Sequence, residues 1–285
     1  TARRRADVLG RRWPAEGGHA DIVAHGGVLR LGLCELIGLP WSACHRLRHG
    51  DAPINPRNDL SFAANFYWML FEVEPSPLIE KILDVILILH ADHTMNASTF
   101  SARVVGSTLA DPYTVVSSAI GTLSGPLHGG ANEEVMRMIG EIGSKENVQP
   151  YIEGKLARKE KIMGIGHRVY RTGDPRGAVL KTYIKKLYET GTVDKKTIEI
   201  SEEIERVVGE KLAQKKLHPN VDCHSGIVFD AICIPVDLYT PVFAMGRVAG
   251  WLAHWMEQLK TNRIYRPTQK YTGLRQQPYV PIDGI

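Results

Sequence analysis

Apolar residues recur at helical spacing along most of the chain after its first 50 residues. The pattern predicts a helix over residues 59–70 with Asp59 as its N-cap. Ser76 followed by Pro77 has the residue types of an N-cap and a first helical position, and so predicts the start of the next helix. Because that helix is apolar nearly all round from Ile82 to Leu89, we expect it to lie deep in the core.

The same spacing predicts further helices over residues 98–109, 111–125, 133–142, 148–161, 175–192, 195–216 and 241–260. Residues 226–234 fit either a strand or a buried helix. Arg-rich stretches and glycine pairs interrupt the pattern in residues 1–50, where we expect broken helices or loops. The chain is therefore expected to be mainly α-helical.

Composition narrows the class of protein. The 285 residues are 44% hydrophobic and 23% charged, which is ordinary globular composition and enough for one large domain or two unequal ones. The longest aliphatic run is far shorter than the roughly 20 residues that span a bilayer, and no apolar signal-peptide region follows the first arginines. Four cysteines fit a reducing cytoplasm. A net charge of +4 is too small to indicate a nucleic-acid partner but suits a small polyanionic substrate.

Two glycine-containing segments each present a histidine. His128 lies in Gly-Pro-Leu-His-Gly-Gly-Ala-Asn, where the glycines allow close approach of a ligand; a helix–helix turn with an incidental histidine explains it equally well. His167 lies in Gly-Ile-Gly-His-Arg-Val-Tyr-Arg, and Asp-Pro-Arg176 follows. Because a guanidinium makes two parallel hydrogen bonds to a carboxylate, this segment is either a substrate loop or a basic surface loop.

Asp222 is a candidate base. It stands in Asn-Val-Asp-Cys-His-Ser-Gly, within an apolar neighbourhood. Burial raises the pKa of a carboxyl group, which is how a protein obtains a base that works near neutral pH. Taken alone, the segment is explained better by an aspartate that caps a helix and by His224 as a core residue.

Other polar side chains stand in unusual places. His90 and His93 are three residues apart on one predicted helical face, but a metal site needs further ligands, so we expect anion binding or helix packing and no metal. Arg247 lies mid-helix in an apolar stretch, where a buried cation must find an anion. Arg266 is explained more simply as an exposed residue. As a set, a carboxylate, several histidines and several arginines favour binding of a small di- or tricarboxylate and removal of a proton.

The order of six motifs closely resembles the citrate synthase family. They are His-Ala-Asp-His…Asn-Ala-Ser-Thr, Gly-Pro-Leu-His-Gly-Gly-Ala-Asn, Gly-Ile-Gly-His-Arg-Val-Tyr…Asp-Pro-Arg, Pro-Asn-Val-Asp-Cys-His-Ser-Gly, Gly-Arg-Val-Ala-Gly and Arg-Pro. The match runs roughly from His45 to Gly273, and residues 1–42 do not match recognisably.

The resemblance implies an all-α homodimer. Its large helical domain would comprise residues 1–127 and 231–285, and its small domain, residues 128–230, would close over the substrates. It implies condensation of acetyl-CoA with oxaloacetate and hydrolysis of citryl-CoA, without a cofactor because acetyl-CoA is a substrate. Asp222 would take a proton from the acetyl methyl group, His128 would hydrogen-bond the thioester oxygen and His167 would polarise the oxaloacetate carbonyl. The side chains implied to hold oxaloacetate are those of His93, Arg176, Arg247 and Arg266, the last reaching the partner's active site.

Three alternatives stay open. A 2-methylcitrate synthase acting on propionyl-CoA keeps the same residues, and one methylene in an apolar pocket is worth only about 1–3 kcal/mol. A catalytically impaired homologue that binds an acyl-CoA or a tricarboxylate is the second. The third is a metal-dependent helical hydrolase that uses His90 and His93. Basic side chains before the His167 loop are candidates for contact with CoA, although a solvated helix face explains most of them: Lys155, Arg158, Lys159 and Lys161.

Overall fold

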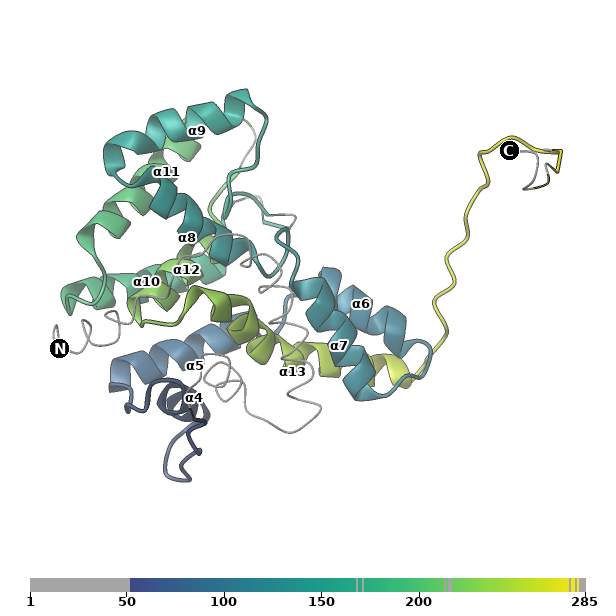
Figure 1. Cartoon of the computed structure of the whole chain (residues 1–285), viewed down its shortest axis with the longest axis horizontal. Coiled ribbons are helices and arrows are strands. Elements are labelled where there is room, and N and C mark those ends of the chain that lie inside the picture. Colours follow the sequence, from purple (N-terminus) through teal and green to yellow (C-terminus); the bar gives the residue numbers. More distant parts are fainter. Residues whose placement is uncertain are drawn as a thin grey trace.

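The computed structural model describes residues 52–281 except for positions 168, 171, 213, 215, 216, 277 and 280 (Figure 1). The broken helices or loops expected in residues 1–50 lie outside the described residues. The helix expected over residues 195–216 ends earlier than predicted, at Lys211, with Leu212 as its C-cap.

Helices are the regular elements of the described residues, and the all-α prediction is confirmed. They are α4 (Phe62–Phe71), α5 (Pro77–Ala91), α6 (Ala97–Gly106), α7 (Pro112–Leu123), α8 (Ala131–Ile142), η1 (Lys145–Asn147), α9 (Val148–Ala157), α10 (Pro175–Glu189), α11 (Lys195–Lys211), α12 (Val221–Ala231), η3 (Val236–Leu238) and α13 (Tyr239–Leu259). Within the same residues, extended pairing is limited to one antiparallel bridge between Ile165 and Pro219.

The first two described helices begin at serine caps. The Ser76 side chain accepts from the backbone N–H of Ile79, and Pro77 opens α5 as predicted. The prediction that Asp59 caps α4 is wrong. Ser61 is the N-cap of α4, and Asp59 instead pairs with the guanidinium of Arg57.

Helix α5 is buried on one side only. Ile82, Leu83 and Ile86 are fully buried, but Ile88 on the opposite side is 63% exposed. The prediction of a helix deep in the core all round is therefore wrong for this chain, although the helix does pack against α13 and α4.

Residues 226–231 of the segment that fitted either a strand or a helix are helical, and the helix ends before residues 232–234. Helix α12 covers residues 221–231, and nearly all of its residues are buried. It packs between α8 and α10, so apolar residues are needed on every side of the helix. Because no polar face remains, the sequence lacks the helical spacing of apolar residues that would identify an amphipathic helix. Asn220 is the N-cap, because its side chain accepts from the backbone N–H of Asp222. Asp222 consequently lies in the first turn and does not act as the cap.

The helices pack in two groups that meet at α13. Helices α5, α6 and α7 pack against α13 and α4 packs against α5, whereas α8 to α12 pack mainly with one another (Figure 1). One hydrophobic core extends through both groups, from Phe66 and Ile82 to Val135 and Val228, and a smaller one lies between α6, α7 and α13. The predicted boundaries at 127/128 and 230/231 stay a prediction.

After α13 the chain becomes extended. Its described residues leave the helices and project away from them (Figure 1). None of the helices that the structure describes combines the length and the apolar character needed to cross a bilayer.

Candidate active site

Four of the predicted site residues line one pocket of about 990 Å³. His93 comes from the turn between α5 and α6, and His128 from the turn before α8. His167 comes from the loop before α10, and Asp222 from the first turn of α12. Segments more than a hundred residues apart in sequence thus converge, and the pocket brings the Asp222 carboxyl group together with three imidazoles.

The Asp222 carboxyl is poised between its charged and neutral forms. Its Oδ1 is buried and has no hydrogen-bond partner. Burial raises the pKa of Asp222 from 3.8 to about 7, while the positive charges of Arg176 and Arg247 act in the opposite direction. A carboxyl group with that pKa and an unused oxygen can accept a proton near neutral pH.

The environment of His128 fixes which of its nitrogens carries the proton. The backbone N–H of Ser98 donates to His128 Nε2 over 3.3 Å, and Ser98 Oγ lies 2.9 Å from the same nitrogen. Nε2 is therefore an acceptor and the proton is on Nδ1. Burial, followed by the charge of Arg247, lowers the pKa of His128 to about 4, so the ring is a neutral donor at neutral pH.

His167 is oriented in the same manner but through its other nitrogen. The backbone N–H groups of Val169 and Tyr170 donate to Nδ1 over 3.0 and 3.4 Å, which leaves the proton on Nε2. The His93 ring packs edge-on against that of His167 with centroids 4.9 Å apart, and its Nε2 lies 3.0 Å from the Tyr170 hydroxyl. Burial and then the charge of Arg176 lower the pKa of both histidines.

Arg176 is held beside the pocket by a buried carboxylate. Its Nε and Nη2 donate to the two oxygens of Asp174 over 3.0 and 2.8 Å. Asp174 Oδ2 also accepts from the backbone N–H of Val221, the first residue of α12. Although burial opposes ionisation, these contacts lower the pKa of Asp174. The same carboxylate therefore fixes Arg176 and the helix that carries Asp222.

Arg247 is buried, as the apolar surroundings in the sequence predict. It is 1% exposed, its Nε donates to the His90 carbonyl oxygen over 2.5 Å, and its guanidinium lies over the Phe243 ring at 4.8 Å. Its Nη1 is buried without a hydrogen-bond partner. Burial lowers the pKa of Arg247 to about 10, so the group stays charged at neutral pH. An unpaired N–H on a buried cation favours an anionic ligand.

Arg266 does not join the other predicted site residues within this chain. It is exposed in the extended segment after α13, where its Nη1 donates to the carbonyl oxygen of Pro267.

His90 and His93 do not form a pair on one helical face, so that prediction is wrong. Helix α5 ends at Ala91, and the extended backbone of Asp92 turns His93 away. His90 is buried with its Nδ1 2.8 Å from the Ile86 carbonyl oxygen. Nowhere in the described parts of the chain do three or more His, Cys, Asp or Glu side chains gather as metal ligands.

Sequence reasoning overlooked the supporting side chains. Ser98, Tyr170 and Asp174 each contact a predicted site residue. Asp174 could have been found, since an aspartate two residues before an arginine can reach its guanidinium. The pairing of Ser98 with His128 spans 30 residues and leaves no local signal.

A family model and similar known proteins point to the same protein family. The family model described as citrate synthase, C-terminal domain, matches residues 25–268. The match begins well before His45, so the resemblance extends further toward the N-terminus than the motifs indicated. The chain is 56% identical to a citrate synthase of Synechocystis over 241 residues, covering 85% of this chain and 60% of that protein. It is 50% identical to citrate synthase 2 of Bacillus subtilis over 85% of this chain and 64% of that one.

Solved structures agree with these relatives. The fold is similar to a citrate synthase from Thermotoga maritima, with a TM-score of 0.82, 34% identity and coverage of 99% of this chain and 81% of that one. It is also similar, with a TM-score of 0.80 and 30% identity over 98% of this chain and 73% of the other, to a Thermoplasma acidophilum citrate synthase solved as a ternary complex with carboxymethyl coenzyme A and oxaloacetate. The chain spans about 60% of the length of the curated relatives named above. On the family match and these identities, the chain belongs to the citrate synthase family.

Proposed function

We propose that this protein condenses acetyl-CoA with oxaloacetate and hydrolyses the resulting citryl-CoA to citrate and CoA. The observation that carries the proposal is the single pocket in which Asp222, with a pKa raised to about 7, meets the neutral rings of His128 and His167. The family match and the relatives named citrate synthase support the same activity.

The first step is removal of a proton from the acetyl methyl group. The ionised Asp222 carboxylate accepts that proton, and the electron pair of the C–H bond moves into the thioester as an enolate. His128 donates its Nδ1–H to the thioester oxygen, where negative charge develops. A donor fixed in advance by Ser98 needs no reorganisation when the charge appears, which is why such groups lower barriers strongly.

The second step joins the two substrates. The enolate carbon attacks the ketone carbon of oxaloacetate, and His167 donates its Nε2–H to the ketone oxygen as that oxygen becomes an alkoxide. Water then cleaves the thioester of citryl-CoA and releases CoA as a thiol. The reaction is balanced by the two substrates and one water, so the proposal includes no cofactor and no metal.

The carboxylates of oxaloacetate require cations. Among the described residues, we assign this role to Arg176 and Arg247; Arg247 has a buried N–H without a partner, and His93 offers a further polar contact. We include in the proposal a homodimer in which Arg266 of the partner subunit completes the site. The exposed apolar side chains of Phe100 on α6 and Tyr113 on α7 support such an interface.

The pocket offers room for the acyl-CoA. Lys161 lines it together with apolar residues such as Ile162 and Leu217. Lys155 and Arg158 are engaged with Glu160, which favours the interpretation of a solvated surface for those two. Closure of residues 128–230 over the rest of the chain would exclude water from the reacting groups. A cytoplasmic location is part of the proposal and rests on the low number of cysteines.

A thiol-release assay tests the function. With acetyl-CoA and oxaloacetate, free CoA should appear at a rate proportional to enzyme and only when both substrates are present. A higher kcat/KM with propionyl-CoA than with acetyl-CoA would instead establish 2-methylcitrate synthesis. Absence of release from either thioester, in protein that still binds oxaloacetate, would establish a binding homologue and contradict the proposed catalysis.

A further inference from the structure

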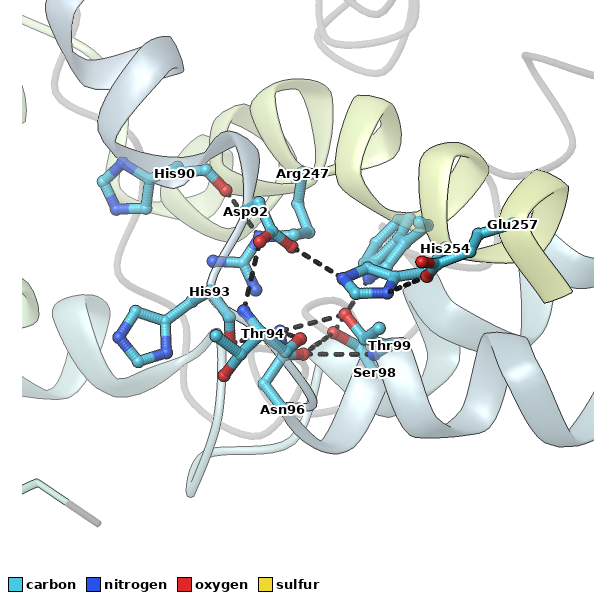
Figure 2. A network of polar contacts seen from close by, with 11 residues as sticks. His90, Asp92, His93, Thr94, Asn96, Ser98, Thr99, Arg247, His254 and Glu257 are labelled. Atoms are coloured by element: carbon cyan, nitrogen blue, oxygen red, sulfur yellow. Dashed lines mark hydrogen bonds and ion pairs between the residues drawn. The ribbon is translucent and has the colours of Figure 1, made fainter. Parts of the chain in front are cut away.

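One face of α13 holds the turn that carries His93. We define this turn, the α5–α6 turn, as residues 92–96 (Figure 2). Arg247, Gly250 and His254 are three, four and seven residues apart on α13, so they share a face of that helix. All three approach the end of α5 or the turn that follows it.

The backbone of α13 approaches the end of α5 unusually closely. A Cβ at Gly250 would lie 2.3 Å from the carbonyl oxygen of Ala91 and 3.1 Å from Asp92 Oδ1, so only glycine fits. Arg247 Nε donates to the His90 carbonyl oxygen, as Figure 2 shows. The last residues of α5 are therefore held directly against the α13 backbone.

The α5–α6 turn itself contains a strained residue. Thr94 has φ of 50°, in the left-handed region that β-branched residues rarely adopt. Its backbone N–H donates to Asp92 Oδ2 over 3.2 Å. The other oxygen of Asp92, Oδ1, accepts from His254 Nε2 over 3.1 Å (Figure 2). His93 stands between Asp92 and Thr94, so the direction of its ring depends on this arrangement.

The chemistry of the pair assigns a direction to the hydrogen bond. An ionised carboxylate only accepts, so His254 must donate from Nε2. His254 Nδ1 is buried without a hydrogen-bond partner, and the Glu257 carboxylate lies 3.9 Å from it. Neither His254 nor Asp92 lines the pocket, whereas His93 and Thr94 do. His254 can therefore influence a ligand only through the turn.

We propose that His254 is a positioning residue for His93, acting through its hydrogen bond to Asp92. That oxaloacetate is the ligand affected by the position of His93 rests on the proposed function. The effect of His254 on the position of His93, through Asp92, does not depend on that function. Loss of the bond frees Asp92, relaxes the strained turn and displaces the His93 ring.

Steady-state kinetics of the full chain test the effect on substrate. His254→Ala should raise the KM for oxaloacetate by about tenfold, the middle of the range for groups in one hydrogen-bond network, and leave the KM for acetyl-CoA unchanged. His254→Gln should restore the KM for oxaloacetate, because its side-chain amide can donate to Asp92. Met256→Ala, at an exposed position of the same helix, is the matched control and should behave as wild type. Added to His93→Ala, His254→Ala should have no further effect.

A second measurement is independent of activity. In substrate-free protein labelled at histidine, the His93 ring-proton NMR signal, identified by its loss in His93→Ala, should shift in His254→Ala and not in Met256→Ala. If wild-type protein releases no thiol, the proposed function fails while this signal still tests the coupling. Asp92→Ala should give the same NMR and KM changes and replaces His254→Ala if that variant does not fold. An unshifted His93 signal in His254→Ala would overturn the proposal. So would a double variant in which the increases in KM for oxaloacetate caused by His93→Ala and His254→Ala multiply.

Discussion

Replacing Asp222 with asparagine should abolish thiol release and also stabilise the fold above neutral pH. The two effects have one origin, the burial of a carboxyl group whose Oδ1 has no hydrogen-bond partner. Asparagine has nearly the same shape but cannot accept the acetyl proton or carry the charge that burial disfavours.

The magnitude follows from the pKa. Burial raises the pKa of Asp222 from 3.8 to about 7, and at about 1.36 kcal/mol per unit this destabilises the folded wild-type protein by about 4 kcal/mol once the carboxylate is fully ionised. Between these pH values the folded protein keeps a proton that the unfolded chain has released, so wild-type stability falls as pH rises through this window. An unpaired asparagine amide subtracts about 1–3 kcal/mol from the gain. A net gain of about 2 kcal/mol corresponds to roughly 4–8 °C in Tm.

Thermal unfolding of wild-type and Asp222→Asn protein across this pH range measures the effect. The variant should be more stable at about pH 8, and its advantage should shrink as pH falls from about 7 toward about 4, because the folded wild-type carboxyl is then neutral and the unfolded one approaches its own pKa of 3.8. A Tm difference that does not change with pH, or a variant less stable than wild type at about pH 8, would show that burial does not raise the pKa of Asp222.

Three further predictions follow from the site and its supports. The kcat/KM for acetyl-CoA should fall about tenfold per pH unit below about pH 7, as Asp222 is protonated; a flat profile between about pH 5 and 8 would argue against this base. Asp174→Asn should lower the free energy of unfolding by about 3–5 kcal/mol, because it leaves the Arg176 guanidinium buried without its carboxylate, and should raise the KM for oxaloacetate; denaturant unfolding and kinetics measure the two. Gly250→Ala should destabilise the fold by about 1–3 kcal/mol, because the added Cβ clashes with backbone. Gly209→Ala on α11, where a Cβ meets open space, should instead stabilise the fold by about 0.5–1 kcal/mol. Equal Tm shifts in the two variants would show that the close contact at Gly250 does not require glycine.

Local signals in the sequence predicted local structure well. Ser76 followed by Pro77 places the start of α5 correctly, since an N-cap and a first-turn proline act within a few residues. The start of α4 was harder, because Asp59 and Ser61 are both good caps; in the structure Ser61 caps the helix and Asp59 pairs with Arg57. For α12, burial on every side removes the period that separates a helix from a strand.

In the candidate site, too, some features could be predicted from the sequence and others depended on contacts between distant residues. The residue types and their motifs identified the four side chains that line the pocket, because a chemistry needs particular groups wherever the fold places them. What orients those groups was hidden from sequence. The contacts of Ser98 with His128 and of His254 with Asp92 link residues 30 and 162 positions apart, and no spacing rule connects such distances.

A crystal structure of the protein with oxaloacetate and a CoA thioester analogue would show whether these side chains form one oxaloacetate site. We expect the ketone oxygen within hydrogen-bond distance of His167 Nε2, the carboxylates on Arg176 and Arg247, and the acyl carbon beside Asp222. Oxaloacetate bound elsewhere, with the pocket that holds His128 and Asp222 empty, would contradict this expectation.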